Sequence, residues 1–137
     1  MNNQEIINRL IDEEGLKFHP YTDTVGKTTI GIGRNLTDNG ITKTEAIYLC
    51  NNDIDNCVKD LHNNFPQFDE WPENVQIVLI DMCFNLGIYQ LMKFYNFLGY
   101  IKIGNYEDAS KEMLNSMWAR QVGVRALKLS ELLKSKI

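Results

Sequence analysis

The chain has 137 residues, of which 44% are hydrophobic and 23% charged, a composition typical of a globular protein and unlike a disordered one. No stretch approaches 18 apolar residues, so we expect no transmembrane helix, and the N-terminus lacks the basic start of a signal peptide. The net charge of −4 argues against a nucleic-acid partner. Residues 82–137 nevertheless carry +4, either as a solvated helix face or as a surface for an anionic polymer or membrane.

The first predicted element is a helix over residues 3–14. Its apolar residues recur at helical spacing, and Gly15 is placed to end it. Residues 17–33 change character and are rich in Thr, Tyr, Gly and Val, with residues 29–33 alternating at period two. This segment predicts a small antiparallel sheet of two or three strands. The apolar stripe of the first helix consists of Ile6, Ile7, Leu10 and Ile11.

A long helix is predicted next, over residues 43–64. Thr42 followed by Glu45 forms a capping box, which is typical of a helix start. Residues 74–86 are apolar on nearly every side, which predicts a helix that is buried all round and ends at Gly87. Further helical patterns cover residues 89–102, 105–118 and 124–136.

Together these elements predict an α+β fold that is mostly α, in a single domain with two lobes. The N-terminal helix and sheet lobe covers about residues 1–41, and the linking helix covers residues 43–64. The helical lobe covers residues 65–137. A cleft between two such lobes is a natural place for a ligand.

The chain has three cysteines, Cys50, Cys57 and Cys83. The odd number and the lack of a C-x-x-C motif argue against a disulfide framework or a zinc site. We expect these residues to be small core side chains in a protein that folds under reducing conditions.

Glu14, the last of three consecutive acids, is the leading candidate for chemistry. Such runs usually form a solvated helix end, but helical geometry places Glu14 within the apolar arc, where packing would favour Leu. Burial and the helix end would both raise the pKa of this carboxyl, and a carboxyl protonated near neutral pH can act as a general acid. The alternative is that Glu14 only pairs with a basic group across the core.

Asp23 and Thr29 are the other candidates. Asp23 lies between two Thr residues before a Gly, a pattern that is equally typical of a turn. Thr29 shares a strand face with Gly31 and Gly33, where a bulky chain could approach the backbone, although such a glycine pair can also mark a sheet bend. A Glu with a raised pKa near a second carboxylate is the arrangement that glycosidases use.

Three segments resemble the signature of phage-type (T-even) lysozymes and related endolysins. They are Glu14-Gly15-Leu16, Tyr21-Thr22-Asp23-Thr24 and Thr28-Thr29-Ile30-Gly31-Ile32-Gly33, in which the family's Glu-x8-Asp-x5-Thr spacing is met without a gap. The likeness continues through Phe84-Asn85-Leu86-Gly87 and the region of Trp118 and Arg125. It covers most of residues 5–130.

The resemblance implies an endolysin-type muramidase, which hydrolyses the β-1,4 bond between N-acetylmuramic acid and N-acetylglucosamine in peptidoglycan. By this likeness Glu14 is the general acid, and Asp23 with Thr29 positions and activates water, with inversion at the sugar. Arg125 is implied to pair with Glu14, and no metal or cofactor is expected. The positions that match the surroundings of the cleft are Tyr21, Asn35, Phe84 and Asn85.

An endolysin of this kind is expected to be a monomer held in the host cytoplasm until a holin-type membrane lesion releases it to the wall. Arg34 stands where T-even relatives carry His, so their His–carboxylate pair cannot form. Two other functions stay open: a lytic transglycosylase acting on the same bond, and a glycan-binding module without turnover. Asp23 and Thr29 argue against both. Chitin or a related polymer also stays open as a substrate.

Overall fold

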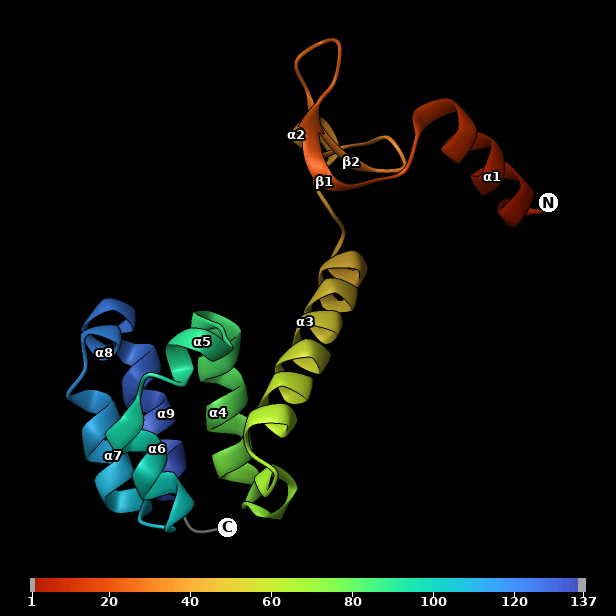
Figure 1. Cartoon of the computed structure of the whole chain (residues 1–137). Helices are drawn as coiled ribbons and strands as arrows, with labels where there is room; N and C mark the ends of the chain where they lie inside the picture. The colour runs from red at the N-terminus through yellow and green to blue at the C-terminus, as the bar shows by residue number, and fades with distance from the viewer. Residues whose placement is uncertain (1, 136–137) are drawn as a thin grey trace. The chain divides into compact units, whose positions relative to one another are not determined.

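The computed structural model of the chain describes residues 2–135 (Figure 1). The chain divides into two compact units, Met1–Leu49 and Cys50–Ile137, and the division falls inside the long helix α3 (Lys43–Asn64). The first unit holds the only sheet within the described residues, and the second is helical. The predicted α+β, mostly α fold is therefore confirmed.

Helix α1 (Asn3–Glu14) has the predicted bounds because both of its ends are capped. The Asn2 side chain accepts hydrogen bonds from the backbone N–H groups of Gln4 and Glu5. At the other end Gly15 has φ +84°, and its N–H donates to Ile11. The expectation that the apolar stripe of α1 lies in a core is wrong for this structure, because no residue of α1 is buried.

The sheet has the order β1–β2–β3 and is antiparallel throughout. Its strands are β1 (Lys17–Thr22), β2 (Thr28–Gly31) and β3 (Arg34–Asn35). The strand predicted over residues 29–33 ends at Gly31, because the chain turns at Ile32 and Gly33. Gly31 and Gly33 have φ of +70° and +67°, values that favour glycine, so they form the turn rather than an open strand face.

Helix α3 starts at the predicted capping box. The Glu45 N–H donates to Thr42 Oγ1 at 3.1 Å, and the Thr42 N–H donates to Glu45 Oε1 at 2.8 Å. Arg34 adds a bidentate ion pair from β3 to both Glu45 oxygens, and its Nη1 also donates to the Gly40 carbonyl at 3.0 Å. The residue that replaces the expected His thus connects the sheet to the first turn of α3.

This ion pair predicts a stability change in acid. The hydrogen bond from Arg34 and the backbone N–H of Thr42 lower the pKa of Glu45 from 4.5 to about 2. Because the folded pKa lies below the unfolded one, the contribution of Glu45 is complete above pH 4.5 and is lost as pH falls from 4.5 towards 2. Thermal unfolding of the wild type should therefore shift to lower temperature over this range. The shift should be smaller for Glu45→Gln, and equal shifts in both proteins would contradict the prediction.

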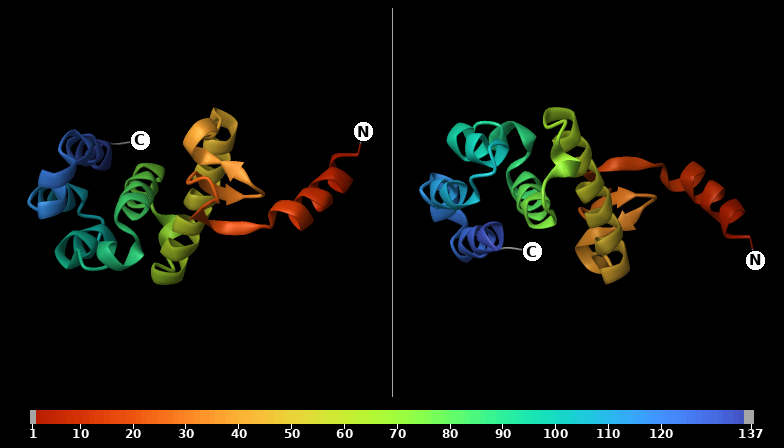
Figure 2. Two further views of the ribbon diagram at one scale, coloured as in Figure 1. Left: turned by 90° about the horizontal axis from the view of Figure 1, so that it is seen from above. Right: turned by 90° about the horizontal axis from the view of Figure 1, so that it is seen from below.

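The described part of the second unit holds the C-terminal part of α3, six further helices and one short 3-10 turn. Figure 2 shows these helices in two further views. Helix α9 packs against both α4 and α7, and α7 also packs against α6. None of the helices described in residues 2–135 is long and apolar enough to cross a membrane. The elements are η1 (Phe68–Glu70), α4 (Glu73–Leu86), α5 (Ile88–Leu91), α6 (Tyr95–Lys102), α7 (Tyr106–Leu114), α8 (Met117–Val122) and α9 (Val124–Lys134).

Helix α4 provides the centre of this core. The sequence predicted that it would be buried on every side, but the structure shows that it is not. Six of its residues are buried, whereas Ile77 and Phe84 are 43% and 44% exposed. It ends at Gly87 as predicted, where the N–H donates to Cys83. The neighbouring helices therefore cover less of α4 than its apolar pattern predicts.

The helices predicted over residues 89–102 and 105–118 are each divided in two. Leu91 and Phe97 are both buried, and a continuous helix would point them about 120° apart, so a break lets both reach the core. The second division falls at Ser116, whose Oγ accepts from the Ala119 N–H at 3.1 Å and donates to the Met113 carbonyl at 2.7 Å. Helix α9 ends at Lys134, and position 136 of its predicted range lies outside the described residues.

Two of the three cysteines, Cys57 and Cys83, lie in this core as expected, whereas Cys50 does not. Cys57 and Cys83 are buried, Cys50 is half-buried, and all three are free. Burial raises the pKa of the Cys83 thiol to about 12 and also raises that of Cys57. Both buried thiols therefore stay protonated and poorly reactive near neutral pH.

Asn74 is a buried polar residue that connects two ends of this unit. Its Nδ2 donates to the carbonyls of Leu132 and Ser135 at 3.0 Å and to that of Leu133 at 3.4 Å. These carbonyls lie at the C-terminal end of α9, where a helix leaves acceptors without an internal partner. Asn74 therefore acts as a side-chain cap supplied by α4.

Replacing Asn74 with Ala should lower the free energy of unfolding by about 1–3 kcal/mol, because the carbonyls lose a buried donor. Asn74→Asp should cost more at pH 7 than at pH 3, since a carboxylate would face the same carbonyls. Denaturant unfolding at both pH values measures this. Equal stability of the wild type and Asn74→Ala would contradict the capping role.

Candidate functional site

Three of the predicted site residues lie in one row across the sheet. Thr29 of β2 is in register with Tyr21 of β1 and with Asn35 of β3. Residues that pair directly across antiparallel strands point to the same face. The sheet thus makes Tyr21, Thr29 and Asn35 neighbours in space, although they are separated in the sequence.

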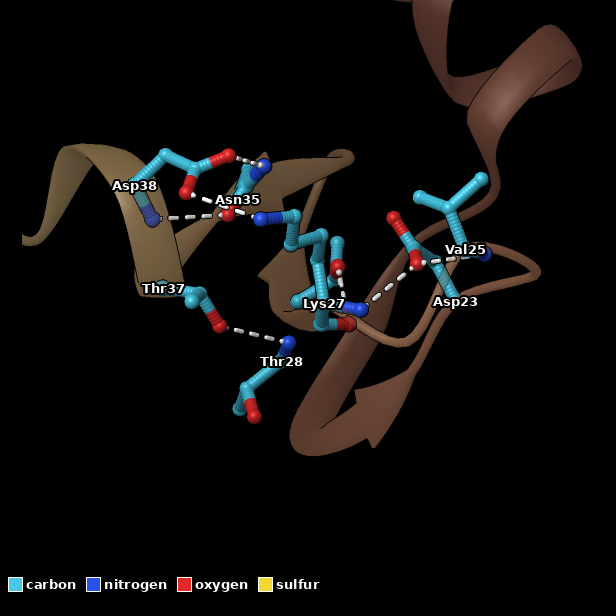
Figure 3. A network of polar contacts seen from close by, with 8 residues as sticks. Asp23, Val25, Lys27, Thr28, Asn35, Thr37 and Asp38 are labelled. Atoms are coloured by element: carbon cyan, nitrogen blue, oxygen red, sulfur yellow. Dashed lines mark hydrogen bonds and ion pairs between the residues drawn. The ribbon is translucent and has the colours of Figure 1, made fainter.

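Asp23 follows β1 directly and organises the turn that leads into β2 (Figure 3). Its Oδ1 accepts from the backbone N–H groups of Val25 at 3.0 Å and Lys27 at 2.8 Å. Its own N–H donates to the Lys27 carbonyl at 2.9 Å. Oδ2 accepts no hydrogen bond from any residue that the structure describes, so one oxygen holds the turn and the other stays available.

Thr29 supports the same turn. It is only 3% exposed, and its hydroxyl donates to the Lys27 carbonyl at 3.1 Å. The backbone of Lys27 therefore makes hydrogen bonds with both Asp23 and Thr29. The expectation that Thr29 lies on an open face is wrong, because the side chain is buried.

Asn35 has a structural role in this region (Figure 3). Its Oδ1 caps the short helix α2 (Leu36–Asn39) by accepting from the Asp38 N–H at 3.0 Å, and its Nδ2 donates to Asp38 Oδ2 at 2.8 Å. Lys27 Nζ pairs with the other Asp38 oxygen at 3.2 Å. The predicted contact of Asn35 with substrate stays a prediction, and its capping role was not predicted from the sequence.

Glu14 is the last residue of α1 and lies against the turn between β2 and β3. A Cβ placed on Gly33 would stand 2.9 Å from Glu14 Oε2 and 3.1 Å from its Cγ. Glu14 is exposed, which corrects the expectation that it occupies a core position. All three proposed catalytic residues, Glu14, Asp23 and Thr29, belong to the first unit.

Arg125 has a partner within the helical unit that the sequence analysis did not predict. Its Nε donates to Asp81 Oδ1 at 2.7 Å, and its Nη2 donates to the Asp81 carbonyl at 3.4 Å. Both residues line a cavity of about 390 Å³ with Phe84 and with Ile54, Ile77 and Ile80. The predicted pairing of Arg125 with Glu14 stays a prediction.

Asn85 orients an aromatic side chain. Its Oδ1 accepts from Trp118 Nε1 at 2.8 Å, which fixes the indole at the wall of a cavity of about 440 Å³. Phe94 packs edge-on to Trp118, with ring centroids 6.2 Å apart. The cavity combines these rings with polar side chains such as Gln121 and Glu112, a lining suited to a polar ligand with apolar faces.

Within the described part of the chain, no three His, Cys, Asp or Glu side chains are grouped closely enough to hold a metal ion. The first unit instead offers one carboxyl at a helix end and one carboxylate fixed by backbone N–H groups. Two carboxyl groups of this kind can donate and accept a proton in one reaction.

Comparisons with known proteins show which family the sequence resembles. The sequence profile of the phage lysozyme family matches residues 11–135. The chain is 27% identical to the pre-baseplate central spike protein Gp5 of Enterobacteria phage T4, over 93% of this chain and 27% of that protein. It is 26% identical to each of two probable T4-type lysozymes of Dictyostelium discoideum, over 83% of this chain and 84% of theirs. The chain thus spans about a quarter of the spike protein and most of the two lysozymes.

The mostly α fold with its small sheet, together with these relatives, defines a glycoside hydrolase of the lysozyme type. The match extends over nearly the whole sequence and includes all three proposed catalytic residues. The chain belongs to the phage lysozyme family.

Proposed function

We propose that this protein is an endolysin-type muramidase that hydrolyses the β-1,4 bond between N-acetylmuramic acid and N-acetylglucosamine in peptidoglycan. The observation that carries this proposal is the family match over residues 11–135, within which Glu14 and Asp23 fall in one folded unit. Their different surroundings support two different roles.

Glu14 is the proposed general acid. Its side chain lies at the C-terminal end of α1, against the β2–β3 turn at Gly33. In the reaction its proton passes to the glycosidic oxygen as the bond to the muramic acid C1 breaks. The leaving glucosamine then departs as an alcohol rather than as an alkoxide.

Asp23 is the proposed base. The two backbone N–H groups on Oδ1 hold its carboxylate in one orientation. Oδ2 accepts a proton from water while the water oxygen attacks C1 from the face opposite the leaving group. This course inverts the configuration at C1.

Thr29 has a more limited proposed role than the resemblance implied. Its hydroxyl proton is directed to the Lys27 carbonyl, so the hydroxyl can offer water only an acceptor lone pair. Through Lys27 it also stabilises the turn that presents Asp23. We therefore assign Thr29 mainly to positioning the base.

Product analysis tests the proposal. Purified peptidoglycan is digested, the new chain ends are reduced with borohydride, and the fragments are identified by mass. The proposal predicts reduced muramic acid at the new ends. Anhydro-muramic acid ends would show a lytic transglycosylase instead, and binding without any new ends would show a glycan-binding module.

The route to the wall is part of the same proposal. As an endolysin, the protein would act as a monomer and remain in the host cytoplasm until a holin-type lesion releases it. The three free cysteines support folding in a reducing compartment.

A further inference from the structure

Helix α1 meets the turn between β2 and β3 at Gly33. A Cβ on this residue would stand 2.9 Å from Glu14 Oε2, 3.1 Å from Cγ and 3.2 Å from Cβ. The carboxylate end could swing away, but Glu14 Cβ is fixed by the backbone of α1. A side chain at position 33 would therefore displace both the carboxyl and the last turn of the helix.

Backbone conformation alone does not explain this contact. Eight glycines within residues 2–135 have positive φ, and Gly33 is the one whose Cβ would meet another residue closer than 3.4 Å. Gly40, in the same unit, has φ +57° and nothing within 4 Å of its Cβ position. Position 33 therefore requires glycine for two separate reasons. Its backbone is left-handed, and Glu14 occupies the space that a Cβ would need.

We propose that Gly33 is a positioning residue for the general acid, and that the β2–β3 turn sets the direction of the Glu14 carboxyl through this contact. The inference rests on the proposed function, since it gives Glu14 its catalytic role. A misplacement of about 1 Å can lower the reaction rate about 100-fold, so even a methyl group at position 33 should slow catalysis measurably.

The test compares Gly33→Ala with Gly40→Ala on purified peptidoglycan. Both substitutions strain a left-handed backbone, so both should lower Tm. Gly33→Ala should also lower kcat by about 100-fold with little change in KM, and should shift the basic limb of the kcat–pH profile. Gly40→Ala should keep the wild-type kcat and pH profile. Equal kcat and pH profiles in the two variants would overturn the inference.

A second arm tests the contact without any use of activity. In a Glu14→Gly background the Oε2, Cγ and Cβ atoms are all gone, so the excess Tm loss of Gly33→Ala over Gly40→Ala should largely disappear. An excess that persists undiminished would overturn the inference. If Glu14→Gln keeps full activity, the proposed function fails, while this Tm comparison still decides whether the contact positions Glu14.

Discussion

Replacing Glu14 with Gln should lower kcat on peptidoglycan by about 10²–10⁴-fold, the usual contribution of a general acid. Gln has the shape of Glu and can occupy the same space against Gly33, but it has no proton to give to the leaving oxygen. KM and Tm should change little. Release of reducing ends, measured over a range of substrate concentrations, separates kcat from KM.

Glu13→Gln is the matched control for this variant. Glu13 is the preceding residue of α1 and is also exposed, so the same charge is removed from the same helix turn. We expect wild-type kcat from Glu13→Gln. A similar loss in both variants would show that the acidic helix end attracts or repels the polymer, and would contradict the assignment of Glu14 as the acid.

The second large effect is expected at Asp23. Asn retains Oδ1, so Asp23→Asn should keep both hydrogen bonds from the Val25 and Lys27 N–H groups and leave Tm unchanged. The uncharged amide cannot accept a proton from water, so kcat should fall by about 100-fold or more. Reducing-end kinetics and thermal unfolding of the same sample measure the two quantities.

Asp23→Ala provides the comparison, because it removes the turn acceptor as well as the charge. It should lose kcat as Asp23→Asn does and also lower the free energy of unfolding by about 1–2 kcal/mol. The sequence also allowed Asp23 to be a turn residue only. In that case Asp23→Asn should keep the wild-type kcat. Full activity of Asp23→Asn would mean that Asp23 only shapes the turn.

Helix ends were predicted best where a local signal specifies them. Asn2 and Gly15 bound α1, and the Thr42–Glu45 box starts α3, so both helices have their predicted bounds. Interactions of this kind involve residues within four positions of each other. These helix ends can therefore be predicted from a single sequence.

Features that depend on distant residues were predicted less well. The break before α6 lets Phe97 reach the core, and no side-chain cap marks the start of that helix. The pairing of Arg125 with Asp81 joins residues 44 positions apart. Likewise, the cap that Asn74 supplies to α9 depends on a contact between two helices.

The candidate site also contains features that were predicted from local sequence and features that depend on distant residues. Asp23 was expected either in a turn or in the chemistry, and the structure shows how one carboxylate serves the turn with a single oxygen. The expected burial of Glu14 was wrong because it was inferred from the phase of one helix alone. The contact of Glu14 with Gly33 could not be predicted, since it depends on the path of the β2–β3 turn.

The central claim is that this chain cleaves peptidoglycan with water, using Glu14 as the acid. The most direct measurement is digestion in water labelled with heavy oxygen, followed by mass analysis of the muramic acid ends. The wild type should place the label at C1 of each new muramic acid end, and Glu14→Gln should release almost none. Unlabelled anhydro ends, or labelled ends released equally by Glu14→Gln, would contradict the claim.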